Sequence, residues 1–123
     1  SYKKKSGTLI PLDLKEKFST EIKRIFYIYG KKNYYRGDHA HKKCKQIFIP
    51  VYGKIELVME NKNNKKKIIL NSKKIKAVYV PKLTWCSLKF LSKNAIIMVL
   101  CDRKYEFSDY IDNYLQFKKM KKN

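Results

Sequence analysis

The two histidines of the chain, His39 and His41, are separated by a single residue. In an extended strand the side chains of residues i and i+2 point to the same face, so this spacing predicts two imidazoles side by side. Imidazole titrates close to neutral pH and can take up or release a proton there. Two such groups on one wall of a pocket are suited to proton transfer or to metal binding. Two unrelated surface histidines are the alternative that stays open at this point.

The composition around these histidines indicates one folded domain. The chain has 123 residues, of which 44% are hydrophobic and 14% aromatic, which is enough for one modest core. We find no secretory signal and no apolar run near the roughly 18 residues that a membrane helix needs. The three cysteines form no CxxC pair, a pattern more typical of reduced thiols than of a disulfide framework. We expect a single cytoplasmic domain over 1–123.

The net charge is +20, from 30 Lys and Arg against 10 Asp and Glu. Such a charge points first to nucleic acid. However, only three of these residues are arginines (Arg24, Arg36 and Arg103), and arginine is the residue that reads bases and phosphates bidentately. We therefore expect no nucleic acid and no membrane as partner, and a basic nucleic-acid-binding barrel is the least favoured alternative. A basic surface would still attract a small phosphorylated ligand.

Short apolar runs separated by turn residues predict strands through most of the chain, at 8–14, 21–29, 39–52, 54–60, 65–70, 77–80, 85–91 and 95–101. Pro11 limits the first of these to an edge strand. A helical period then begins near Ser108 as the N-cap, with Asp109 in the first turn, and leads into a basic tail at 118–123. About eight short strands and one terminal helix predict an all-β antiparallel barrel or jelly roll.

The residues that follow the histidines resemble the first motif of the cupins. That motif runs His-x-His, three or four residues, Glu, six residues and Gly. Here it runs from His39 and His41 through four residues to Gln46, and through six more to Gly53. The spacing agrees throughout, and Gln in place of Glu is the one departure. The resemblance implies a cupin jelly roll, a double-stranded antiparallel β-barrel, with a short C-terminal helix.

The second cupin motif, Pro-x-Gly-x-x-His, departs further. Pro81 is kept, but Leu83 and Cys86 occupy the Gly and His positions. A metal cupin would supply three imidazoles and a carboxylate, whereas this chain offers two imidazoles, an amide and a thiol. Glutamine is a poor ligand for zinc or iron. We expect no metal and no other cofactor, although a site of two histidines and a cysteine stays chemically possible.

Several longer blocks match one cupin family. They comprise 23–29, Arg-Gly-Asp-His-Ala-His-Lys at 36–42, Gln46, Tyr-Val-Pro at 79–81, Trp85, Tyr105, Ser-Asp-Tyr-Ile at 108–111 and Tyr114. On these blocks the chain, from 8 to 117, resembles the sugar 3,4-ketoisomerases that act on dTDP-4-keto-6-deoxyglucose. The histidine block together with the Asp-Tyr-Ile segment is specific, whereas the cupin motif alone is weak because that fold hosts many chemistries.

The resemblance implies an isomerase that binds a dTDP-linked 4-keto-6-deoxy sugar in the barrel and moves its carbonyl from C4 to C3. An aminotransferase would then use the 3-keto product on the way to a 3-amino-3,6-dideoxy sugar, within deoxysugar and lipopolysaccharide O-antigen biosynthesis. It also implies a metal-independent homodimer whose N-terminal strands, about 8–14, are exchanged between subunits. A metal-dependent cupin enzyme and a nucleotide-sugar epimerase remain alternatives.

The reaction needs a base that removes the C3 proton, giving an enediolate, and a proton delivered to C4. An imidazole meets this need, and His39 is our choice for the base. His41, on the same face, is expected to position the substrate, tune His39 or relay the proton. Cys86 is expected to lie opposite, point towards the sugar and influence the face on which C4 is reprotonated, so the C4 configuration of the product stays open.

Four further residues are candidates for substrate binding. Tyr27 and Tyr29 share one face of a strand, and their phenols could donate to the enediolate oxygen or pack in the core. Arg36 suits the diphosphate or a sugar oxygen, or is a solvated loop residue. Gln46 is five residues after His41, so strict alternation along one strand would point it to the opposite face. It would reach the histidine face only through a one-residue bulge.

Overall fold

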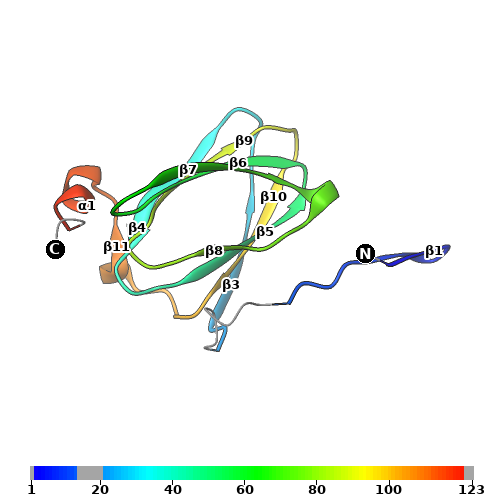
Figure 1. Ribbon diagram of the computed structural model, residues 1–123, viewed down its shortest axis with the longest axis horizontal. Coiled ribbons are helices and arrows are strands. Elements are labelled where there is room, and N and C mark those ends of the chain that lie inside the picture. Colours follow the sequence, from blue (N-terminus) through cyan, green and yellow to red (C-terminus); the bar gives the residue numbers. More distant parts are fainter. Residues whose placement is uncertain (1, 14–20, 121–123) are drawn as a thin grey trace.

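The computed structural model describes residues 2–13 and 21–120, and Figure 1 shows a β-rich body with one short helix. The strands are β1 (Tyr2–Lys4), β2 (Gly7–Leu9), β3 (Arg24–Tyr29), β4 (Tyr35–His41), β5 (Gln46–Tyr52), β6 (Lys54–Glu60), β7 (Lys65–Asn71), β8 (Val78–Val80), β9 (Trp85–Phe90), β10 (Ile96–Cys101) and β11 (Tyr110–Ile111). The helix is α1 (Tyr114–Met120), and two 3₁₀ turns are η2 (Ser72–Lys74) and η3 (Phe107–Asp109). No helix in these ranges is long and apolar enough to cross a membrane.

Two antiparallel sheets form the body of the molecule, as the alternating pattern predicts. One has the order β3-β10-β5-β8 and the other β11-β4-β9-β6-β7. Their inward side chains, among them Ile55, Leu57, Phe90 and Val99, are fully buried in one core. The all-β fold class is confirmed. Among the described strands, the two sheets are not joined by a ladder into a closed barrel.

The predicted single strand at 39–52 is wrong, because the chain forms two strands there. β4 ends at His41 in the five-stranded sheet, and β5 begins at Gln46 in the four-stranded sheet. The connection between them is fixed by two carboxylates: Lys43 N donates to Asp109 Oδ1 at 2.7 Å, and Lys45 N donates to Asp102 Oδ1 at 2.9 Å. The histidines and Gln46 consequently lie on opposite walls of the sandwich.

The N-terminal strand is shorter than predicted. β2 ends at Leu9 and pairs with β1 in a hairpin that stands away from the two sheets, on the side opposite α1 (Figure 1). Ile10 and Pro11 continue without strand pairing, as expected where a proline removes a donor. Position 14, the predicted end of this strand, lies outside the described residues.

The C-terminal helix is confirmed, but its predicted start is wrong. Ser108 and Asp109 lie in η3, and the next two residues form β11, which pairs with β4. α1 begins only at Tyr114, after Asn113, whose Oδ1 accepts from Gln116 N at 3.0 Å in the manner of an N-cap. Pairing with the edge of β4 therefore outweighs the helical period at 110–111.

Candidate active site

A cavity of about 520 Å³ opens between the two sheets. Its apolar lining includes Phe48, Leu88 and Val99. Its polar lining combines residues of both sheets: Arg36, His39, Cys86 and Tyr110 from one, and Arg24 and Gln46 from the other. An apolar chamber with a few convergent polar groups is the usual form of a small-molecule site. Six of the predicted site residues are thus brought together: Tyr27, Tyr29, Arg36, His39, Gln46 and Cys86.

The histidine pair has the geometry that the His-x-His spacing predicts. The ring centroids of His39 and His41 lie 5.2 Å apart, with the planes nearly perpendicular. His39 lines the cavity, and its Nδ1 donates to the Gly37 carbonyl oxygen at 3.3 Å. With Nδ1 carrying the proton, Nε2 of His39 keeps its lone pair and can act as a base.

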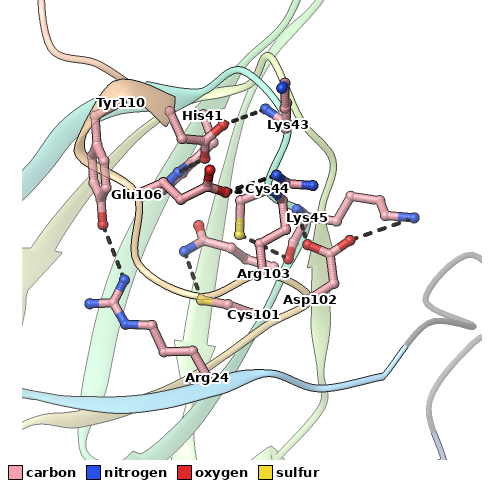
Figure 2. A network of polar contacts seen from close by, with 12 residues as sticks. Arg24, His41, Lys43, Cys44, Lys45, Cys101, Asp102, Arg103, Glu106 and Tyr110 are labelled. Carbon is pink, nitrogen blue, oxygen red and sulfur yellow. Dashed lines mark hydrogen bonds and ion pairs between the residues drawn. The ribbon is translucent and has the colours of Figure 1, made fainter.

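His41 lies deeper and has a carboxylate partner. Its Nδ1 is 2.8 Å from Asp109 Oδ2, and both side chains are buried. Figure 2 shows His41 between Tyr110 and the Lys43–Lys45 connection. The His41 Nε2 atom is buried and has no hydrogen-bond partner among the described residues. The pair therefore consists of one histidine facing the cavity and a second one anchored behind it.

Burial lowers the pKa of both histidines from the usual 6.5. For His39, desolvation is the largest cause, and the charge of His41 adds to it. For His41, desolvation again dominates, and the hydrogen bond that His41 donates to Asp109 opposes it. Both imidazoles are consequently neutral at pH 7, the state in which an imidazole can accept a proton.

A β-bulge in β4 brings Arg36 and His39 to the same cavity. The pairing of β4 with β9 shifts between Gly37 and His39, and Gly37 and Asp38 both have positive φ, 95° and 57°. The extra residue lets side chains three positions apart face one way. A one-residue bulge thus occurs in this region, but before the histidines.

Gln46 reaches the cavity without the predicted bulge, because it begins a separate strand on the facing sheet. It is buried, and its Nε2 donates to the Cys101 sulfur at 3.4 Å. The prediction of a bulge before Gln46 was wrong, since it assumed one continuous strand from His41 to Gln46. The role of Gln46 in substrate binding stays a prediction.

Cys86 lies beside His39 and not opposite to it. The two residues are paired in neighbouring strands β9 and β4, and both line the cavity. Burial raises the pKa of the Cys86 thiol to about 12. Cys86 is therefore a neutral thiol at pH 7, next to the predicted base.

Tyr27 and Tyr29 border the cavity, but their side chains are 53% and 75% exposed. They alternate along β3 with Arg24, Phe26 and Ile28, whose side chains are half-buried. Their predicted hydrogen bond to the enediolate stays a prediction.

Sequence reasoning missed Arg24, Asp109 and Tyr110 as site residues. Arg24 Nη1 donates to the Tyr110 hydroxyl at 3.4 Å, and the Tyr110 ring centroid is 4.4 Å from His41 and 5.1 Å from His39 (Figure 2). Arg24 has a signal in the sequence, because it alternates with two apolar residues and is one of only three arginines. Asp109 and Tyr110 were missed because the sequence pattern assigned both residues to a helix.

The side chains at the cupin metal positions do not form a metal cupin's ligand set. Gln46 and Cys86 offer an amide and a neutral thiol where such a site has a carboxylate and an imidazole. A different group, His41, Cys44 and Asp109, has donor atoms within 4.8 Å of one another. Between His41 and Asp109 the separation is that of a hydrogen bond, with a proton between the two atoms. That the site works without metal stays a prediction.

Comparisons with known proteins agree with this geometry. The family model described as WxcM-like, C-terminal (FdtA) matches residues 1–122. The TDP-4-oxo-6-deoxy-alpha-D-glucose-3,4-oxoisomerase of Aneurinibacillus thermoaerophilus is 32% identical over 114 residues, which are 92% of this chain and 81% of that protein. A 3,4-ketoisomerase structure from Helicobacter canadensis is 36% identical, with a TM-score of 0.86, over 98% of this chain and 90% of that one.

A histidine-to-asparagine mutant of the 3,4-ketoisomerase QdtA from Thermoanaerobacterium thermosaccharolyticum, solved in complex with TDP-4-keto-6-deoxyglucose, is also similar. It is 29% identical, with a TM-score of 0.86, over 98% of this chain and 88% of that one. The predicted resemblance and the isomerase class are confirmed. The chain belongs to the sugar 3,4-ketoisomerase family.

Proposed function

We propose that this chain converts TDP-4-keto-6-deoxyglucose to the 3-keto isomer in the cavity between its two sheets. The observation that carries the proposal is the neutral imidazole of His39 on the cavity wall, with its lone pair on Nε2 and the anchored His41 behind it. A relative in this family is named for action on this sugar nucleotide, and another was solved with it bound.

In this reaction His39 Nε2 takes the proton from C3. The C3–H electron pair forms the C3=C4 bond of an enediolate, and the C4 carbonyl oxygen takes up negative charge. A proton is then delivered to C4, and the C3 hydroxyl proton passes to the C4 oxygen, so that a carbonyl forms at C3 and a hydroxyl at C4. Atoms and electrons balance without an oxidant. The Tyr110 hydroxyl and the Arg24 guanidinium, both on the cavity wall, are suited to stabilise the developing negative charge.

Arg36 and Cys86 have separate roles in the proposal. Arg36 lines the cavity at an exposed position and would contact the diphosphate, to which a guanidinium can bind bidentately. Cys86 adjoins His39 and would influence the face on which C4 receives its proton. The 3-keto product is suited to amination at C3, on the way to a 3-amino-3,6-dideoxy sugar.

The enzyme would act as a homodimer. β3 is an edge strand whose outward residues Ile25, Tyr27 and Tyr29 are all more than half exposed. The β1-β2 hairpin stands away from the body and carries Leu9, which is 61% exposed (Figure 1). Both surfaces would be covered if N-terminal segments were exchanged between two copies.

A cytoplasmic location is also proposed, in agreement with three buried, unpaired cysteines.

The test is to incubate the protein with TDP-4-keto-6-deoxyglucose in D₂O and follow the sugar ring by NMR. We expect a 3-keto product with deuterium at C4, and loss of turnover in His39→Asn. A carbonyl that stays at C4 while C3 or C5 inverts would instead show an epimerase. An unchanged rate in His39→Asn would remove His39 as the base. Treatment with a chelator should leave the rate unchanged, because the proposal uses no metal.

A further inference from the structure

We propose that Asp109 is a positioning residue, which holds His41 in the tautomer whose Nε2 can accept a proton. This inference rests on the proposed function and deepens it, because it gives His41 a defined part in proton transfer beside His39. Asp109 is not among the residues that line the cavity, and its side chain contacts His41, so it acts through His41.

Both oxygens of the Asp109 carboxylate are occupied. Oδ2 is 2.8 Å from His41 Nδ1, and Oδ1 accepts from Lys43 N at 2.7 Å. The Asp109 backbone carbonyl also accepts from Lys42 N at 2.8 Å. The side chain is buried. With both oxygens held and its backbone fixed, the carboxylate cannot turn away from the imidazole.

This contact determines where the His41 proton lies. A carboxylate only accepts hydrogen bonds, so His41 Nδ1 must be the donor, and the neutral ring then has its lone pair on Nε2. That Nε2 is buried and has no partner among the described residues. Buried polar atoms without partners are uncommon and call for a specific reason. A proton acceptor held ready next to His39 and Tyr110, whose rings lie 5.2 and 4.4 Å from the His41 ring, supplies one.

The substitution Asp109→Asn separates this role from packing. Asparagine has the shape of aspartate, but one of its two terminal atoms is an NH₂ donor. The Lys43 N–H cannot cease to be a donor, so the asparagine oxygen must stay with it. The NH₂ group then faces His41 Nδ1, which has to become an acceptor, and the ring proton moves to Nε2. The variant would therefore keep the fold and exchange the tautomer.

Histidine ¹⁵N–¹H correlation NMR reads this tautomer directly, and the chain has only two histidines to assign. We expect the Nδ1–H form for His41 in the wild type and the Nε2–H form in Asp109→Asn. Asp102→Asn is the matched control. Asp102 also accepts from a backbone N–H of the same connection, that of Lys45, and is equally buried in its side chain, but its hydrogen bonds and ion pair go to Lys45 and not to a histidine. It should leave the His41 tautomer unchanged.

Turnover should follow the tautomer. We expect Asp109→Asn to lower kcat by about 10²-fold or more, as is usual when a general acid–base group is lost, with KM within a few-fold. Asp102→Asn should retain kcat. An Nε2–H tautomer of His41 in the wild type would overturn the inference without any variant. So would an unchanged tautomer in Asp109→Asn, or equal losses of kcat in the two variants. The NMR measurement needs no substrate, so a failure of the proposed function would be seen separately, as wild-type protein with the expected tautomer and no turnover.

Discussion

The bulge at Gly37 supports both the stability of the protein and the geometry of its site, and Gly37→Ala tests the two together. Gly37 has φ +95°, a conformation that an L-residue adopts at a cost of about 1–2 kcal/mol. An added Cβ would also lie 2.9 Å from the Cys86 carbonyl oxygen, a backbone atom that cannot move aside like the end of a side chain. Together these effects should lower the free energy of unfolding by about 2–3 kcal/mol.

For a domain of this size, such a loss corresponds to a decrease in Tm of about 10 °C. Calorimetry and denaturant unfolding measure it. Because the bulge sets the spacing of Arg36 and His39, kcat/KM at a temperature where the variant is folded should also fall, by about tenfold or more.

Gly53→Ala is the control for strain alone. Gly53 also has positive φ, +78°, and its added Cβ would meet Ser92 Oγ, but it is not among the cavity residues. It should lower stability and leave kcat/KM near the wild-type value. A change of less than about 0.5 kcal/mol in Gly37→Ala would refute the strain argument. Equal effects of the two variants on kcat/KM would refute the role of the bulge in the site.

Two further predictions concern charge at the site. Burial lowers the pKa of both His39 and His41 below the usual 6.5, so the midpoint of the acid limb in the profile of kcat/KM against pH should lie below 6.5. A midpoint at or above 6.5 would contradict this. Arg24→Met should lower kcat/KM by about 10²-fold because it removes the cation beside Tyr110. Arg103→Met, which breaks an exposed pair with Glu106, should have little effect in the same assay.

The period of the apolar residues predicts most of this fold, because alternation is a local property that burial of one sheet face preserves. The bounds of β6, β7, β8, β9 and β10 lie within one residue of where the pattern places them. The errors lie where contacts between residues far apart in the sequence determine the local structure. The turn after His41 is fixed by carboxylates at 102 and 109, and no local signal near the histidines announces them.

The features of the site likewise fall into those that local spacing predicts and those that depend on long-range contacts. The side-by-side histidines follow from a spacing of two on one strand, and the cavity position of Cys86 follows from its place in the second cupin motif. The Asp109 contact joins residues 68 apart, and Arg24 reaches Tyr110 across 86. Such pairs depend on which strands become neighbours, and in particular on β11 pairing with β4. The periodicity of a single sequence does not reveal the order of the strands in a sheet.

The closeness of the two imidazoles has a consequence for the chemistry. The charge of a protonated His41 lowers the pKa of His39, so the pair does not readily hold two protons at once. A proton taken from the substrate therefore belongs to the pair, and uptake on one ring favours release from the other. An isomerisation that removes one proton and returns one needs this property. A single exposed imidazole would lack both the depressed pKa that keeps it neutral and the neighbour that favours proton release.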